Sequence, residues 1–294
     1  MSIRSVLRPW YHKMTRSRLF VSRPLPHTIE KMLIEGQHQT SSLQPSILHF
    51  SLNKAATQSV KSILQQIAQK NNLISVQMNE MAFNSNLPYM DQLDAIAFQP
   101  YQKVFQPVGY LYSAFGGLVP YIHQLERYKI VFMVRDPRDI LVSTYFSMAY
   151  SHPEPSIDSN KRNAFLALKK NVQNTDINDW VLEWAPTLKI NIEKYVKELL
   201  PRFPDLPIFK FEDMAHDFEV WLKQLTDHIE CSLSEKSRQN LILHNLQKIP
   251  RKEQVSQHVR KGRHGDYEEK LNRQTIEALN LQFSEEMKLF GYLV

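Results

Sequence analysis

The sequence predicts an α/β fold with three layers, in which helices flank a central and mostly parallel β-sheet. Three short apolar runs, at residues 47–52, 129–134 and 207–211, have the length and composition of buried strands, and each precedes a segment with helical features. Strands that alternate with helices are typical of a parallel sheet covered on both faces. Apolar residues make up 43% of the 294 residues, which is enough for one sizeable core.

The first predicted strand leads into an amphipathic helix at residues 57–70. Within this helix, apolar residues recur at intervals of three and four, at Val60, Ile63, Leu64 and Ile67. The short loop between strand and helix therefore lies at an edge of the predicted sheet.

The second strand, at residues 129–134, is followed by clear helix-start residues. Asp136 is a natural N-cap and Pro137 suits the first helical position, so we expect a helix from Pro137 to about Ala149. Between the two strand–helix units, residues 78–121 are rich in aromatic residues and poor in charge. We expect this stretch to form loops over a pocket.

The second half of the chain continues the alternation of helices and strands. A long helix is expected over residues 179–200 and a third strand over 207–211. Residues 249–266 are polar and basic without periodicity. Further helices are expected at 215–229, 234–246 and 268–289.

Length and composition favour one compact domain over two. We place this domain at residues 46–294, preceded by a basic arm at residues 1–45. Six lysines and arginines precede the first acidic residue of the arm, Glu30. Such an arm suits peripheral contact with an acidic membrane, and a solvated tail is the alternative interpretation.

The bulk composition restricts the class of ligand and the compartment. A net charge of +6 favours an anionic ligand. Cys231 is the only cysteine, which excludes an internal disulfide and is typical of a reducing compartment, so we expect a cytoplasmic location. The histidines show no metal-ligand spacing. We therefore expect no metal, and we expect no nucleic-acid partner.

The loop after the first strand has the composition of an anion-binding cradle. The small residues Ala55 and Ala56 let the backbone close around a phosphate, and amide groups at a helix start point toward such a ligand. Lys54 and the hydroxyls of Thr57 and Ser59 supply further donors. An ordinary helix start is the alternative, and the loop lacks the glycines and the Lys-Ser/Thr pair of a Walker sequence.

A second candidate anion site follows the second strand. Arg135 stands at the carboxyl end of that strand, and Ser143 lies six residues beyond Pro137, about 9 Å along the helix. The two side chains are placed to clamp one phosphate from two sides. A simple ion pair of Arg135 with Asp136 or Asp139 is the alternative interpretation.

A third candidate is the basic segment at residues 260–267. It combines side chains that carry positive charge or donate hydrogen bonds with two glycines. A flexible basic loop can close over an anion, and a solvated surface loop is the alternative.

Taken together, the three segments resemble the motifs of sulfotransferases that use 3′-phosphoadenosine 5′-phosphosulfate (PAPS). The first is similar to the family's Lys-Ser-Gly-Thr-Thr-Trp loop, the second to its Arg-Asn/Asp-Pro-x-Asp-x-x-Val-Ser frame, and the third to its Arg-Lys-Gly-x-x-Gly-Asp-Trp segment. Phe211-Glu212-Asp213 also resembles the family's Tyr-Glu-Asp. The motifs follow the family's order from about Ile47 to the C-terminus, so the resemblance implies a P-loop-like fold.

The resemblance also implies an activity and a set of site residues. The enzyme would pass the sulfuryl group of PAPS to an acceptor hydroxyl or amine, and Lys54 would stabilise the charge that develops on the leaving group. The first loop would hold the 5′-phosphosulfate, and the second and third motifs the 3′-phosphate. The residues implied in binding PAPS are Lys54, Ala55, Ala56, Thr57, Gln58, Ser59, Arg135, Ser143, Phe211, Arg260, Lys261 and Gly262.

Two departures from the family pattern affect the candidate site. Ser59 replaces the tryptophan that stacks on adenine in one branch, and Phe211 is the candidate substitute, with a core phenylalanine as the alternative. The histidine base of that branch is absent from residues 109–112. Other branches use a glutamate in a segment that resembles the one around Glu80, so Glu80 is the candidate catalytic base, with a solvated loop carboxylate as the alternative.

The sequence leaves the acceptor and two rival functions open. The aromatic middle of the chain suits a carbohydrate, a lipid or a small molecule as acceptor. A P-loop small-molecule kinase would need ATP and magnesium, and a non-catalytic basic module would bind anions without turnover. The oligomeric state is equally open.

Overall fold

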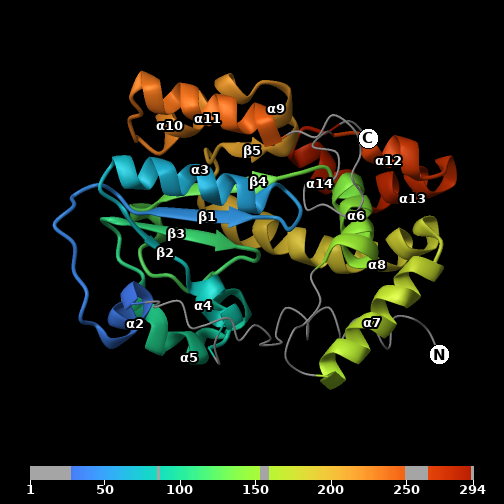
Figure 1. Ribbon diagram of the computed structural model, residues 1–294, viewed down its shortest axis with the longest axis horizontal. Coiled ribbons are helices and arrows are strands. Elements are labelled where there is room, and N and C mark those ends of the chain that lie inside the picture. The colour runs from blue at the N-terminus through green and yellow to red at the C-terminus, as the bar shows by residue number, and fades with distance from the viewer. Residues whose placement is uncertain (1–27, 85–86, 153–158, 249–263, 293–294) are drawn as a thin grey trace.

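Figure 1 shows the computed structural model of the chain, which describes residues 28–84, 87–152, 159–248 and 264–292. Its strands form one five-stranded sheet in the order β2-β3-β1-β4-β5, and all neighbouring strands run parallel. The predicted α/β class is therefore confirmed. The strands are β1 (Ile47–Ser51), β2 (Ile74–Val76), β3 (Tyr110–Phe115), β4 (Lys129–Val134) and β5 (Ile208–Lys210).

The sheet is buried because alternate side chains of each strand enter two separate cores. In β4, Val131 and Met133 pack into one core, whereas Ile130, Phe132 and Val134 pack into the other. Both cores are apolar, which explains why β4 is a nearly continuous apolar run.

Helices cover both faces of the sheet, as the three-layer prediction requires (Figure 1). The face that is uppermost in the figure carries α3 (Thr57–Lys70), α9 (Phe211–His216), α10 (Phe218–His228) and α11 (Glu235–Lys248). The opposite face carries α2 (Thr28–Glu35), α4 (Met78–Asn84), α5 (Ala95–Phe98) and α8 (Ile177–Lys194).

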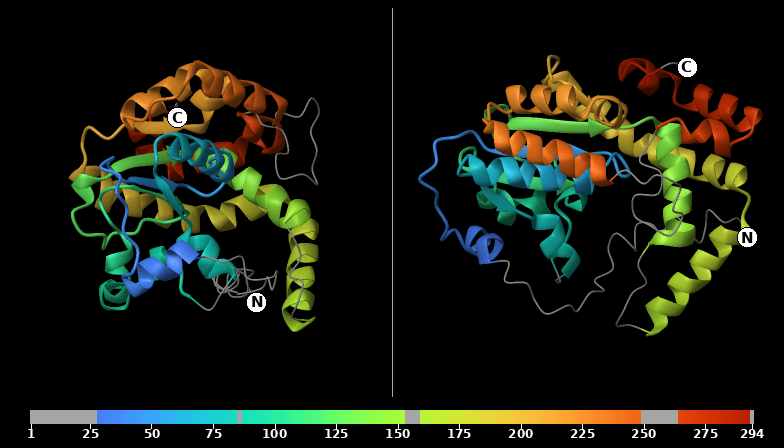
Figure 2. Two further views of the ribbon diagram at one scale, coloured as in Figure 1. Left: turned by 60° about the vertical axis from the view of Figure 1, so that its left-hand side comes forward. Right: turned by 45° about the horizontal axis from the view of Figure 1, so that its top comes forward.

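A third group of helices lies beyond the carboxyl ends of the strands, at the right in Figure 1. It consists of α6 (Pro137–Phe146), α7 (Ser159–Asn174), α12 (Asp266–Lys270), α13 (Arg273–Gln282) and α14 (Ser284–Leu289). In both views of Figure 2, α7 extends away from the sheet, and it packs against the π-helical turn η4 (Ser147–Ser151) that continues α6. None of the described helices has the length and apolar composition needed to cross a membrane.

Several predicted elements are confirmed closely. α3 spans the predicted residues 57–70, and its four apolar stripe residues are buried. α6 begins at Pro137, and the N-cap Asp136 accepts a hydrogen bond from the backbone N–H of Arg138 over 2.9 Å. The predicted long helix begins at Ile177 and ends at Lys194, with shorter helical turns up to Arg202.

Two predictions about elements are wrong. Residues 78–121 are not loops, because they contain α4, α5 and the interior strand β3, although residues within 95–121 do line a hollow. The predicted helix at 268–289 is divided into three. The side chain of Asn272 accepts a hydrogen bond from the N–H of Thr275 and so caps a new helix inside the predicted one.

The predicted arm at residues 1–45 contains the helix α2, which contacts the core. Residues 1–27 lie outside the described part of the chain. α2, within the predicted arm, places Leu33 in the core with no exposed surface, and the carboxylate of Glu30 accepts a hydrogen bond from the N–H of Gln77 over 2.7 Å. α2 therefore packs against the domain that we place at residues 46–294.

Candidate active site

Two of the predicted anion-binding segments meet at the carboxyl edge of the sheet. β1 and β4 are neighbours, but the chain leaves β1 toward β2 on one side and leaves β4 toward β5 on the other. In open parallel sheets, ligands bind in the crevice at such a point of divergence. Arg135 after β4 donates from Nη1 to the carbonyl oxygen of Lys54 after β1 over 3.1 Å. Tertiary structure thus joins two motifs that are 81 residues apart.

The loop after β1 turns sharply through two left-handed residues. Lys54 has a φ of 68° and Ala56 a φ of 57°, a region that side chains other than glycine occupy at a cost of about 1–2 kcal/mol. Ala55 between them is fully buried, and its N–H donates to the carbonyl of Leu52 over 3.0 Å. The related family motif has glycine at the position of Ala56. The strained turn therefore keeps the shape expected of a phosphate-binding loop.

The first turn of α3 presents backbone amides to the crevice side of this loop. The N-cap residue, Ala56, has no side chain that accepts a hydrogen bond, and the first amides of a helix have no acceptor within the helix. The hydroxyl of Thr57 lies 2.8 Å from Oγ of Ser51 and 3.4 Å from the carbonyl of Leu52, so it ties the helix start to the end of β1. Gln58 is exposed and Ser59 is half-buried. This helix start has the features of an anion-binding terminus.

Arg135 is held on three sides in a buried position. The side chain of the arginine contacts the Lys54 carbonyl, its Nη2 lies 3.3 Å from Oδ2 of Asp139, and its guanidinium lies 4.3 Å from the ring centre of Phe211. The residue is only 8% exposed. Arg135 therefore does form the ion pair with Asp139 that the sequence left as an alternative. Its side chain also contacts the Lys54 loop at the carboxyl edge of the sheet.

The other predicted nucleotide contacts lie in different parts of this region. Ser143 is half-buried on α6, and Phe211 is buried as the first residue of α9, with its ring against Arg135. Phe211 is thus both a core residue and a neighbour of the candidate site. Arg260, Lys261 and Gly262 lie outside the described residues.

Glu80, the candidate base, lies on α4 and forms an ion pair with α3. Its carboxylate is 2.5 Å from Nζ of Lys61, and its side chain is 35% exposed. Lys61 stands four residues after Thr57, one helical turn from the start of α3. The neighbouring residue Asn79 donates to the carbonyl of Ala114 in β3 over 3.3 Å. Glu80 is therefore placed between the first turns of α3 and the carboxyl end of β3.

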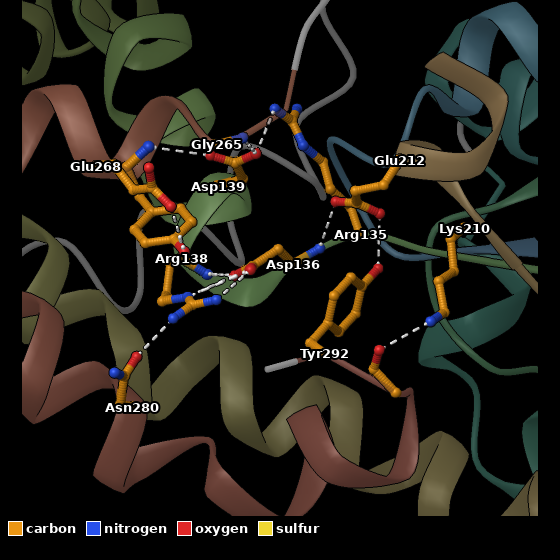
Figure 3. A network of polar contacts seen from close by, with 12 residues as sticks. Arg135, Asp136, Arg138, Asp139, Lys210, Glu212, Gly265, Glu268, Asn280 and Tyr292 are labelled. Atoms are coloured by element: carbon orange, nitrogen blue, oxygen red, sulfur yellow. Dashed lines mark hydrogen bonds and ion pairs between the residues drawn. The ribbon is translucent and has the colours of Figure 1, made fainter. Parts of the chain in front are cut away.

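A polar network behind Arg135, drawn in Figure 3, was not predicted. Glu212 accepts hydrogen bonds from the N–H of Asp136 over 3.0 Å and from the hydroxyl of Tyr292 over 2.8 Å. Burial raises the pKa of Glu212, and these hydrogen bonds oppose that shift. The sequence pointed to Glu212 only through the similarity of residues 211–213 to a family motif, and that similarity did not indicate what Glu212 contacts.

Arg138 forms the other half of this network. It pairs with Oδ2 of Asp136 over 2.6 Å, donates to Oδ1 of Asn280 over 2.7 Å, and lies 4.0 Å from the ring centre of Tyr267. These contacts join the turn between β4 and α6 to α12 and α13. The turn that presents Arg135 is therefore fastened to the C-terminal helices.

A narrow cavity of about 30 Å³ adjoins the loop after β1. Its lining includes Asn53 and Gly116 together with Thr144, Trp184 and Asn191. A Cβ atom on Gly116 would lie 2.9 Å from Oδ1 of Asn53, so a larger residue here would require the exposed Asn53 side chain to shift. A larger hollow of about 700 Å³, between α5 and Arg202, contains none of the predicted site residues.

No metal cluster accompanies these side chains in the described ranges. Among the described residues, no group of three or more histidine, cysteine, aspartate or glutamate side chains could hold a metal ion.

Fold and site define a P-loop-like α/β protein whose candidate anion site lies beyond the carboxyl ends of β1 and β4. The chain belongs to the sulfotransferase family, because the model of the sulfotransferase domain matches residues 44–291. This match confirms the family resemblance inferred from the three motifs.

Solved structures match most of the chain at low sequence identity. The mouse sulfotransferase SULT7A1 complexed with PAP is 15% identical, with 92% of this chain and 91% of that chain covered and a TM-score of 0.47. Retinol dehydratase with androsterone and the inactive cofactor PAP is 16% identical, with 90% and 85% covered and a TM-score of 0.45. The same enzyme with retinol and PAP is 14% identical, with 90% and 86% covered and a TM-score of 0.43. No curated protein sequence gives a significant match.

Proposed function

We propose that the chain transfers the sulfuryl group of PAPS to a hydroxyl or amine of an acceptor. The observation that carries this proposal is the hydrogen bond from Arg135 to the Lys54 carbonyl. It joins the two loops that would hold opposite ends of one nucleotide. Membership of the sulfotransferase family supplies the class of reaction.

The charges and donors of the crevice fit a nucleotide with two anionic ends. The uncapped start of α3, with Lys54 beside it, suits the 5′-phosphosulfate. Arg135 and the hydroxyl of Ser143 suit the 3′-phosphate, since a guanidinium binds two phosphate oxygens at once. The ring of Phe211 packs against the guanidinium of Arg135. Phe211 would therefore position Arg135 in addition to its suggested role near the adenine.

In the proposed reaction, an acceptor oxygen or nitrogen attacks the sulfur of PAPS. The bond between sulfur and the bridging oxygen breaks, adenosine 3′,5′-bisphosphate (PAP) leaves, and the acceptor proton passes to the carboxylate of Glu80. Negative charge gathers on the bridging oxygen as this bond breaks. Lys54 and the amides of Ala56 to Ser59 would stabilise that charge.

For the acceptor we propose a neutral molecule that enters beside Asn53 and Gly116. The residues that line the narrow cavity there are apolar, amide or hydroxyl residues, and none of them is charged. A charged acceptor would lose its hydration without gaining an ion pair. The cavity has room for about one water molecule, so it would admit only the reacting group of a small molecule, a lipid or a neutral carbohydrate. The cytoplasmic location and the membrane contact of the N-terminal arm remain parts of this proposal that rest on sequence alone.

Calorimetric titration tests the donor site. Purified protein is titrated with PAP, with adenosine 5′-monophosphate, and with ATP and magnesium. PAP should bind most tightly, and Arg135→Ala should weaken PAP binding about 10- to 100-fold, the range for a hydrogen bond to a charged group. Arg127→Ala, an exposed arginine outside the site, is the matched control and should bind PAP normally.

The rival functions give different results in the same titration. A preference for ATP with magnesium would favour the small-molecule kinase. Binding of all anions without regard to the 3′-phosphate would favour the non-catalytic basic module.

The role of Glu80 is tested by turnover. Radiolabelled PAPS is offered with panels of neutral and anionic acceptors, and the best acceptor is used for kinetics. Glu80→Gln should lower kcat about 10²- to 10⁴-fold and leave PAP affinity unchanged. Glu35→Gln, which changes an exposed carboxylate on α2, should leave kcat unchanged.

A further inference from the structure

Asp139 is a fully buried carboxylate that accepts three hydrogen bonds at the turn behind the crevice (Figure 3). Its Oδ2 accepts from Nη2 of Arg135 over 3.3 Å and from the N–H of Gly265 over 2.9 Å. Its Oδ1 accepts from the N–H of Tyr267 over 3.1 Å. A buried carboxylate is costly unless it is paired and hydrogen-bonded, and here both oxygens are satisfied.

These bonds connect two segments that lie far apart in the sequence. Asp139 and Arg135 belong to the turn between β4 and α6, whereas Gly265 and Tyr267 form the start of α12. Gly265 is the N-cap of α12 with a left-handed φ of 76°, so its N–H takes a direction that glycine permits most readily. One carboxylate oxygen is thus shared by the guanidinium and the start of α12.

The shared oxygen restricts the orientation of Arg135. The guanidinium is also held by the Lys54 carbonyl and faces the ring of Phe211. A free arginine loses up to about 2 kcal/mol of rotamer entropy when it is fixed, and a side chain that is fixed in advance does not lose it again on binding a phosphate.

We propose that Asp139 is a positioning residue for the 3′-phosphate end of PAPS. It fixes the guanidinium of Arg135 in the orientation that binds the phosphate, and it couples this orientation to the start of α12. Asp139 itself does not contact the nucleotide, because it is fully buried and its charge would repel a phosphate. This inference rests on the proposed function and deepens it.

A competing role makes the opposite prediction. If Asp139 only neutralised Arg135, its carboxylate would compete with the phosphate for the same guanidinium. Removal of its charge would then tighten the binding of PAP.

The test compares two nucleotides in an otherwise intact chain. Asp139→Asn is titrated with PAP and with adenosine 5′-monophosphate, which lacks the 3′-phosphate. The affinity for PAP should fall about 10-fold or more, while the affinity for adenosine 5′-monophosphate stays within about twofold. The ratio of the two affinities is the readout, because a general loss of stability would not change it.

Tyr292→Phe is the matched structural control. It removes the hydroxyl that donates to Glu212, a contact that ties the C-terminal part of the chain to α9 and in which Arg135 forms no hydrogen bond. The variant should unfold more easily in urea and keep the wild-type ratio of affinities. Asp139→Glu, which keeps the charge but moves it by one methylene, is measured in parallel, and circular dichroism identifies the folded variants.

Four outcomes are informative. A fall in the ratio for the folded Asp139 variants alone supports the positioning role. Unchanged or tighter binding of PAP by those variants overturns it, and so does an equal fall for Tyr292→Phe. If the wild-type protein itself makes no distinction between the two nucleotides, the proposed function fails first and the positioning role fails with it.

Discussion

Arg135 donates a hydrogen bond to the backbone carbonyl of Lys54 over 3.1 Å, and this contact does not involve the lysine side chain. Lys54 and Arg135 are therefore joined through the backbone. Removal of the Lys54 side chain should leave Arg135 in place. The roles of the two residues at the two ends of the nucleotide can thus be separated by mutation.

Lys54→Ala should weaken both PAP and adenosine 5′-monophosphate by the same factor, about 10-fold, because both nucleotides carry the 5′-phosphate that the lysine would bind. Arg135→Ala should weaken PAP alone. Calorimetry of both variants with both nucleotides measures this. A loss of the preference for PAP in Lys54→Ala would show that the two ends are not independent.

His49 should make the protein less stable in acid. Its Nδ1 lies 3.1 Å from Oγ of Ser113, and burial, aided by the charge of Lys61, lowers its pKa from the usual 6.5 to about 3. Between these values the unfolded chain binds a proton that the native protein does not bind. The free energy of unfolding therefore falls as the pH drops below about 6.5, by up to about 1.4 kcal/mol per pH unit from this residue.

Urea unfolding at several pH values between 4 and 7 measures this slope. His49→Gln should flatten it, since glutamine does not titrate. His123→Gln, at an exposed histidine, should keep the wild-type slope. Parallel slopes for all three proteins would rule out the buried histidine as the cause.

Ala56→Gly should not destabilise the protein. Glycine relieves about 1–2 kcal/mol of strain at the left-handed φ of 57°, and the added freedom of the unfolded chain offsets about 0.4–1 kcal/mol of that gain. Ala278→Gly, at an exposed position inside α13, should cost about 1 kcal/mol. Urea unfolding of both variants checks the contrast, and an equal loss in both would mean that Ala56 is not strained.

Asp91→Asn should stabilise the protein at neutral pH by about 1 kcal/mol. Burial raises the pKa of Asp91, against the opposing effects of a backbone hydrogen bond and Lys194, and its Oδ1 is buried with no hydrogen-bond partner among the described residues. The native protein therefore binds this proton more tightly than the unfolded chain. Stability falls as the pH rises from about 3.8 through the raised pKa and stays reduced above it.

The gain from Asp91→Asn should accordingly vanish as the pH is lowered toward 4. Thermal and urea unfolding of the variant across pH 4 to 8 measure this trend. Asp205→Asn, at an exposed loop carboxylate, should have no such effect. A variant that is destabilised at all pH values would show that the carboxylate makes a favourable native contact.

The sequence predicted well those features that depend on neighbouring residues. The stripe of α3 follows from helical spacing, and the start of α6 follows from Asp136 and Pro137. The strand β3 was missed because residues such as Tyr110 and Tyr112 occur both in core strands and in aromatic pockets. Only the pairing of β3 with β1 and β2 shows that they belong to a strand. The capping role of Asn272 was missed because the residues before and after it both have helical spacing, which predicted one continuous helix.

The sequence by itself determined the fold class, the family motifs and the places of the basic and small residues along the chain. Only the tertiary structure decided that Arg135 meets the Lys54 carbonyl, that the N–H groups of Gly265 and Tyr267 reach Asp139, and that Glu80 pairs with Lys61. The physical reason is that motifs and periodicity are local, whereas these contacts depend on strand order. β1 and β4 lie side by side although 77 residues separate the end of one from the start of the other.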